Sequence, residues 1–309
     1  MDRVYIDTPH NFSDIETYVS TDINEIKKLI IMAKKCFFYD ACSFRNHMFA
    51  SDNKPILTYI KRYADVVIIT RTVMMELCSS DGKLWKEHIN YIRNMHAEGI
   101  KILVIYEEDI FDVLRTYCAD VTQINKWLSY AVRCAKSKAG KVEMVVGSDM
   151  ELRRYLFVGE ESTDSMLASK MFGKVRDSKS SGDNMGEELM AVCVHWLSRM
   201  RDVESYKYVV LTDDKKSIPT YGKVIKNVRE YSGCDAIAIC TTVKLCYLMY
   251  MNSIITEEKQ ITDVLSNTSM GSSVIVFCSE EFELYPTEKT MCVDEYAKKI
   301  FAKGIKVYH

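Results

Sequence analysis

The sequence predicts an α/β fold of three layers (α/β/α), in which helices cover both faces of a mainly parallel central sheet. Short runs of Val, Ile, Phe and Tyr alternate with longer segments whose apolar residues recur about every 3.6 positions. Several short runs are apolar at consecutive positions, which is typical of strands buried on both faces. Gly (12) and Pro (4) are too scarce in these 309 residues for a turn-rich all-β fold.

Strand and helix patterns alternate along most of the chain. The strand segments are short and rich in β-branched and aromatic residues, and we place them at residues 3–6, 36–39, 66–69, 101–106, 142–146, 208–211, 236–239 and 273–277. The helix segments carry apolar residues on one face, and we place them at residues 23–33, 83–97, 110–116, 124–134, 187–200 and 293–302. Residues 173–186 are polar and contain clustered Gly and Ser, so a loop is predicted there.

Composition and charge exclude several classes of protein. Lys and Arg (41) nearly balance Asp and Glu (43), so binding to a polyanion would need a local basic face. The 11 cysteines include no CxxC pair, which predicts reduced thiols rather than disulfides or a zinc site. The N-terminal segment lacks the apolar core of an export signal, and the longest apolar stretch, residues 236–255, is interrupted by polar side chains. We therefore expect a cytoplasmic protein that does not interact with membranes.

Acidic residues follow several predicted strands at the point where each strand ends. In chain order they are Asp40 after the strand at 36–39, Glu76 after 66–69, Asp183 or Glu187 before 208–211, and Asp213 with Asp214 after it. Because the carboxyl ends of parallel strands meet at one edge of a sheet, we expect these acids to converge there.

A cluster of carboxylates is chemically distinctive because like charges repel and raise the pKa values of their neighbours. A hard divalent cation such as Mg²⁺ or Mn²⁺ prefers oxygen ligands and would neutralise the cluster. A metal held in this way can activate a water molecule for hydrolysis of a phosphodiester bond. A single Asp after a strand more often caps a helix or faces solvent, but four acids in consistent order favour a metal site.

The same residues resemble the PIN domain family. The motifs that carry the resemblance are a strand followed by DACSF, a strand followed by Thr and a helix with Glu-Leu, the helix GEELMAVCV, and YVVLTDDKK. The resemblance covers approximately residues 30–245. PIN domains are metal-dependent nucleases, most often ribonucleases, with three α/β/α layers and a parallel sheet, so the resemblance implies this fold and activity here.

The resemblance also implies roles for individual residues. The expected catalytic and metal-binding acids are Asp40, Glu76, Glu187 and Asp213. Three alternatives stay open, namely Asp7 for the first acid, Asp183 for the third and Asp214 for the fourth. Ser43 and Thr212 are expected to orient the metal ligands.

Two parts of the chain depart from a compact PIN domain. The interval between Glu76 and Glu187 is long, so an insertion is expected near residues 118–180 of a domain that spans residues 1–250. Residues 251–309 are expected to add a strand and a helix packed on the same domain.

A mild excess of positive charge lies within the predicted insertion. Residues 115–182 contain twelve Lys or Arg against eight acids, which is as consistent with a solvated face as with a track for a phosphate backbone. The residues expected to contact nucleic acid are Lys174, Arg176, Lys215 and Lys216.

Two functional hypotheses follow. The first is a nuclease that uses Mg²⁺ or Mn²⁺ to activate water, with RNA favoured over DNA as its substrate and a homodimer or a regulatory protein as further partners. The second is a catalytically silent PIN-like scaffold that binds protein or nucleic acid in a larger assembly. Fold likeness alone does not separate them, whereas convergence of the four carboxylates within metal-bridging distance, about 4–8 Å, would.

Overall fold

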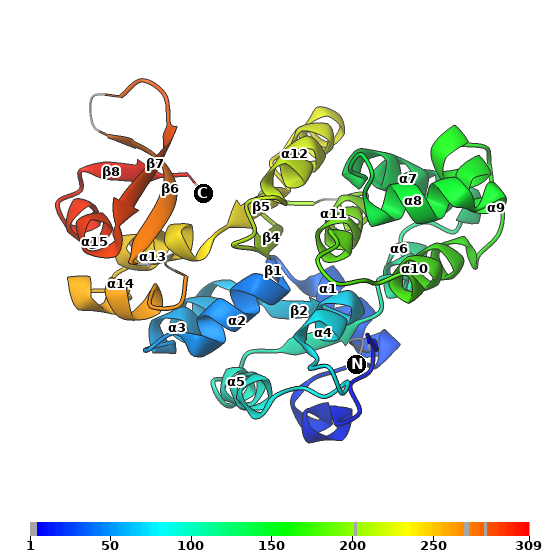
Figure 1. Cartoon of the computed structure of the whole chain (residues 1–309). Coiled ribbons are helices and arrows are strands. Elements are labelled where there is room, and N and C mark those ends of the chain that lie inside the picture. Colours follow the sequence, from blue (N-terminus) through cyan, green and yellow to red (C-terminus); the bar gives the residue numbers. More distant parts are fainter. Residues whose placement is uncertain (1–4, 201–202, 269–271, 281–282, 309) are drawn as a thin grey trace.

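The computed structural model describes residues 5–200, 203–268, 272–280 and 283–308. A five-stranded sheet lies at its centre, with the strand order β3-β2-β1-β4-β5 and every neighbouring pair parallel (Figure 1). The strands are β1 (Cys36–Tyr39), β2 (Val66–Thr70), β3 (Ile102–Ile105), β4 (Tyr208–Leu211) and β5 (Ile237–Cys240).

Every residue of β1, β2, β3 and β4 is buried, which requires that both faces of the sheet are covered. Helices flank the sheet at α1 (Ile23–Met32), α2 (Ala41–Phe49), α3 (Lys54–Tyr63), α4 (Arg71–Leu77), α5 (Lys86–Ala97), α6 (Asp109–Arg115), α11 (Met185–Leu197), α12 (Ile218–Ser232) and α13 (Thr242–Met251). Two short 3₁₀ turns, η1 (Phe12–Asp14) and η2 (Glu16–Tyr18), precede α1. The predicted α/β class with a parallel central sheet is confirmed, and the burial pattern is consistent with α/β/α layering.

Polar residues at the strand ends begin the following helices. Asp40 accepts a hydrogen bond from the Ala41 backbone at the start of α2, whereas Thr70 and Thr241 cap α4 and α13 by accepting from the backbone three residues further on. The strand order reverses between β1 and β4, and in sheets of this kind ligands bind at the carboxyl ends of the two strands beside the reversal. Asp40 follows β1, and Thr212 follows β4, at this point.

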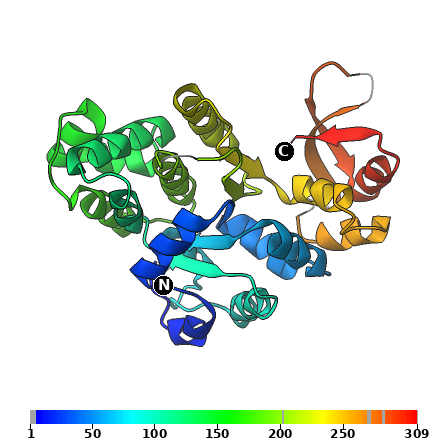
Figure 2. The same cartoon turned by 180° about the vertical axis from the view of Figure 1, so that it is seen from behind.

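The connection from β3 to β4 is largely helical and covers residues 118–180, where an insertion was expected. After α6 it contains α7 (Val121–Ala135), α8 (Lys141–Ser148), α9 (Met150–Leu152), a π-helical turn η3 (Arg153–Val158) and α10 (Leu167–Asp177). These helices gather beside α11, at the end of the molecule opposite the C-terminal residues (Figures 1 and 2). The Trp196 indole on α11 donates a hydrogen bond to the Ile124 carbonyl of α7 at 3.2 Å.

Three predictions of secondary structure are corrected. Residues 142–146 belong to helix α8 rather than to a strand, because Val142 and Val146, one helical turn apart, form its buried face. The predicted loop at 173–186 begins inside α10, which continues to Asp177, and ends inside α11. Of the predicted strand at 3–6, residues 3 and 4 lie outside the described residues, and residues 5 and 6 are in no strand.

The C-terminal module forms a second, smaller sheet. It contains α14 (Glu258–Val264), β6 (Ser273–Glu280), β7 (Thr287–Cys292), α15 (Val293–Phe301) and β8 (Ile305–Val307), with the antiparallel order β7-β6-β8. The sequence predicted one strand and one helix here, whereas the structure adds α14, β7 and β8. The Tyr296 hydroxyl donates to the Val243 carbonyl at 2.6 Å, which ties α15 to α13.

Glu188 joins the helical connection to α11. Its carboxylate is buried and accepts hydrogen bonds from the Ser137 backbone (2.6 Å), the Ser137 hydroxyl (2.5 Å) and the Val142 backbone (2.9 Å). Gly140 passes so close that a Cβ atom there would lie 2.0 Å from the Glu188 carboxylate. Glu188 thus serves as a structural anchor for the start of α8.

We predict that Glu188→Ala lowers the free energy of unfolding by about 3 kcal/mol, because the buried Val142 backbone and two half-buried donors of Ser137 lose a buried acceptor. Chemical denaturation monitored by circular dichroism measures the loss. The control is Glu230→Ala on the exposed part of α12, which should change stability by less than about 0.5 kcal/mol. Equal stability of the two variants would contradict this role of Glu188.

Candidate functional site

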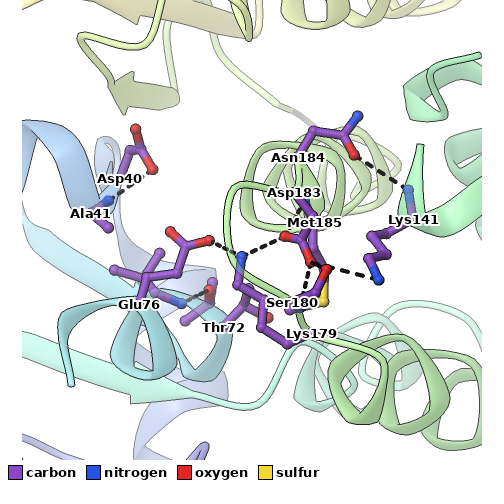
Figure 3. Close-up of polar contacts among 12 residues, drawn as sticks. Asp40, Ala41, Thr72, Glu76, Lys141, Lys179, Ser180, Asp183, Asn184 and Met185 are labelled. Carbon is purple, nitrogen blue, oxygen red and sulfur yellow. Dashed lines mark hydrogen bonds and ion pairs between the residues drawn. The ribbon is translucent and has the colours of Figure 1, made fainter. Parts of the chain in front are cut away.

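Five acidic side chains line one pocket of about 240 Å³ at the carboxyl edge of the large sheet. They come from four separate segments of the chain and are Asp40, Glu76, Asp183, Glu187 and Asp214. The structure therefore brings these acids to one pocket, as expected, but among the described residues no three of them are arranged to hold one metal ion. Figure 3 shows Asp40 and Glu76 on one side of the site, with Asp183 opposite them at the start of α11.

Asp40 is held in place by three donors. One carboxylate oxygen accepts from the Ala41 backbone at 2.8 Å, and the other accepts from the Cys42 thiol at 2.6 Å and the Thr212 hydroxyl at 2.9 Å. Its side chain is almost completely buried. Burial, followed by the negative charge of Glu76, raises the pKa of Asp40 to about 6, although the three hydrogen bonds oppose this rise.

Glu187 is the acid of the pocket whose pKa is raised most. Burial, then a hydrogen bond with Asp214 and the charges of Glu76 and Asp40, raise the pKa of Glu187 to about 9. One of its carboxylate oxygens, Oε2, is buried without a hydrogen-bond partner among the described residues. A buried carboxylate oxygen of this kind has unused capacity to accept a donor or a cation.

Lys179 bridges two acids of the pocket. Its ammonium nitrogen lies 2.6 Å from Glu76 Oε1 and 2.6 Å from Asp183 Oδ1, and its side chain is almost completely buried (Figure 3). Burial alone would lower the pKa of Lys179, but the two carboxylates raise it above its usual value. Asp183 also accepts from the Ser180 and Met185 backbones, so it orders the start of α11.

The backbone of α11 approaches Glu76 closely at Gly186. A Cβ atom at this position would lie 2.7 Å from Glu76 Oε1 and 3.1 Å from its carboxyl carbon. A larger residue at position 186 would therefore push the Glu76 carboxylate away from Lys179. The small residue allows α4 and α11 to bring their acids to one place.

The structure places Asp213 outside the acidic pocket and puts Asp214 in it. The Asp213 carboxylate accepts from Ser43 (2.8 Å), Asn46 (2.9 Å), and the Thr242 hydroxyl and backbone (both 2.6 Å). It therefore ties the end of β4 to α2 and to the first turn of α13. The expectation that Asp213 joins the other acids is corrected, and the alternative, Asp214, occupies that place.

The two residues expected to orient metal ligands differ in what they contact. Thr212 donates to Asp40 and accepts from the Asp214 backbone at 3.2 Å, so it does connect two acids of the pocket. Ser43 donates instead to Asp213, because its position on α2 faces the start of α13. Asp7 lines a neighbouring pocket with Arg176 and Lys179 rather than the acidic one.

Two of the four basic residues expected to contact nucleic acid are engaged elsewhere. The buried Arg176 guanidinium pairs with Glu107 and Glu108 at 2.6 Å each, so it is not offered to a phosphate backbone, and this prediction is corrected. Lys174 forms an ion pair with Asp149 on the outer side of α10.

Lys215 and Lys216 are differently placed. Both are exposed on the loop between β4 and α12, directly after Asp214, and neither forms an ion pair with a carboxylate in the described part of the chain. They remain candidates for contact with phosphate groups.

Two acids of the pocket, Glu76 and Asp183, are arranged around the ammonium group of Lys179. In the described parts of the chain, no three Asp, Glu, His or Cys side chains are arranged to hold one metal ion. Lys179 occupies the space between Glu76 and Asp183, and sequence analysis assigned it no role. Its spacing of four residues from Asp183 was the available signal, but that spacing is informative only if the segment is ordered.

The comparisons with protein families, curated proteins and solved structures gave no match for this chain. None of the helices within the described residues has the length and apolar character needed to cross a lipid bilayer.

The raised pKa of Glu187 predicts that stability falls as the pH rises. A carboxyl group with a higher pKa in the folded state stabilises that state while it is protonated, and this contribution is lost as the pH approaches about 9. In EDTA between pH 7.5 and 8.5, the native protein should lose up to about 1.4 kcal/mol per pH unit more than Glu187→Gln does. Parallel curves of unfolding free energy against pH for the two proteins would exclude the raised pKa.

Proposed function

We propose that this protein is a divalent-metal-dependent nuclease that hydrolyses phosphodiester bonds at the acidic pocket, with RNA as the favoured substrate. The observation that carries the proposal is the convergence of five carboxylates, from four segments, at the carboxyl edge of β1 and β4. Structural roles alone do not require five acidic side chains in one pocket, since like charges at close range repel one another. The resemblance to PIN domains supports the same activity.

The residues present fit a hard divalent cation in their chemistry. All five are oxygen donors, and the unpartnered Oε2 of Glu187 is a position where a cation would be favourable. Asp40, Glu76, Glu187 and Asp214 would hold Mg²⁺ or Mn²⁺, which supplies a more acidic water molecule and offsets charge on the phosphate. Thr212 fixes the orientation of Asp40 by a hydrogen bond. Asp183 would keep its ion pair with Lys179 while the other acids bind the cation.

One observation favours the second candidate, a catalytically silent scaffold. Lys179 already supplies a positive charge to Glu76 and Asp183, and a lysine can neutralise an acidic cluster permanently. In that case the pocket would be a structural charge network, and binding of protein or nucleic acid would be the whole function. Cleavage by the purified protein separates the two candidates.

We predict that the native protein cleaves single-stranded RNA in the presence of Mn²⁺, and that Asp40→Asn reduces the rate at least about 100-fold, because a ligand charge at the pocket is lost. Asp214→Asn should reduce the rate similarly without loss of stability. Gel analysis of mixed RNA and DNA oligonucleotides measures the rates and identifies the substrate.

Asp213→Asn is the matched control, because Asp213 lies beside Asp214 but outside the pocket. It should lower the free energy of unfolding by about 1–3 kcal/mol, since a half-buried acceptor of four hydrogen bonds becomes a partial donor. Absence of cleavage by well-folded native protein would favour the scaffold, and equal cleavage by Asp40→Asn would place the active site elsewhere.

A further inference from the structure

A groove of about 560 Å³ lies beside the acidic pocket. It runs between the carboxyl edge of β4 and β5 on one side and strands β6 and β7 of the small sheet on the other. Cys42 and Asp214 line both cavities, so the groove and the acidic pocket share a wall. Its volume is within the range of about 300–1,000 Å³ that is common for sites that bind small organic groups.

One wall of the groove is the open face of the small sheet. Residues alternate between the two faces of β6, and Val276 and Cys278 are buried within the C-terminal module. Ile275 and Phe277 point the other way, are only partly buried and line the groove. On the neighbouring strand β7, Thr290 pairs with Ile275.

Phe277 gives this wall a flat aromatic surface. Its ring lies edge-to-face with the ring of Tyr308, which follows β8, at a centroid distance of 6.2 Å. The opposite wall contributes the apolar side chains of Ile218 and Val243. An aromatic ring on the open face of an antiparallel sheet is a common platform on which an unpaired nucleobase stacks.

The uncharged polar groups that line the groove can bond to a nucleobase inside it, and the lysines at its border can attract a phosphate group outside it. Asn46, Thr241, Asn267 and Thr290 line it and carry amide or hydroxyl groups that can bond to base edges. Lys215 and Lys216 lie at its border and would attract the backbone phosphates.

The carboxylates of the groove oppose an acidic occupant. Asp213 and Glu288 both line it, and Glu288 is exposed, so an acidic peptide inside the groove would meet like charges. An uncharged nucleobase carries no such penalty.

We propose that this groove binds the base of a nucleotide of a single-stranded nucleic acid, next to the phosphodiester that occupies the acidic pocket, with the base stacked on Phe277. The inference rests on the proposed function and adds its substrate form. A base must be unpaired to enter the slot between the two walls, so the preferred substrate is single-stranded. The C-terminal module thereby becomes a part of the substrate-binding surface.

Fluorescence anisotropy with 5′-fluorescein-labelled U₁₀ RNA and dT₁₀ DNA tests the inference. The buffer contains Ca²⁺, a hard cation that offsets the carboxylates of the acidic pocket, and gel analysis confirms that the oligonucleotides stay intact. Phe277→Ala removes the platform, and Thr290→Trp fills the groove from an exposed strand position where the fold tolerates a large side chain. Each should weaken binding about 5- to 100-fold. Tyr285→Ala, which removes an aromatic residue that is 78% exposed between β6 and β7, should leave binding unchanged.

The outcomes distinguish this inference from the proposed function. Unchanged binding in both Phe277→Ala and Thr290→Trp would overturn the groove site, as would failure of the native protein to bind either oligonucleotide. Binding that depends on Phe277 without any cleavage in Mn²⁺ would support the groove and contradict the nuclease. Should Phe277→Ala fail to fold, Thr290→Trp alone decides.

Discussion

Electrostatic repulsion among carboxylates at one sheet edge is the constraint on which the site depends. In this parallel sheet the strand order reverses between β1 and β4, and the carboxyl ends of the strands lie at one edge. The acids of the pocket lie at that edge. The structure offsets part of the charge with the buried ammonium group of Lys179 and part with protonation of Glu187, whose pKa is raised to about 9. In the proposed nuclease, a divalent cation would neutralise the negative charge that remains on the acids of the pocket.

The general plan of the sheet and several acids of the pocket could be predicted because they depend on local patterns. Strands β1 to β5 appear as short apolar runs, and Asp40 and Thr212 follow two of them directly. The sequence does not show which of two adjacent acids enters the pocket, because Asp213 and Asp214 differ only in the direction of their side chains after β4. The Thr242 backbone selects Asp213 as its acceptor, and that contact depends on how β5 and α13 lie beside β4.

The remaining errors have similar physical causes. Residues 142–146 (VEMVV) contain three β-branched valines, but their burial follows a helical period because the start of α8 is anchored by Glu188 from a distant helix. Strand β7 reads as TEKTMC and is mostly exposed, so it carries little hydrophobic signal, and only its pairing with β6 defines it. The sequence predicted Arg176 to contact nucleic acid because its partners, Glu107 and Glu108, are about 70 residues away and reach it only through the tertiary fold.

Titration of Mn²⁺ followed by electron paramagnetic resonance tests whether the acids around Lys179 form the proposed metal site. We expect the native protein to bind Mn²⁺, Asp40→Asn to bind it at least about 10-fold more weakly, and Lys179→Met to bind it more tightly because a competing cation is removed. Binding of Mn²⁺ that is equally weak in all three proteins would rule out a metal site there. Lys179 would then be the permanent counter-ion of a structural charge network.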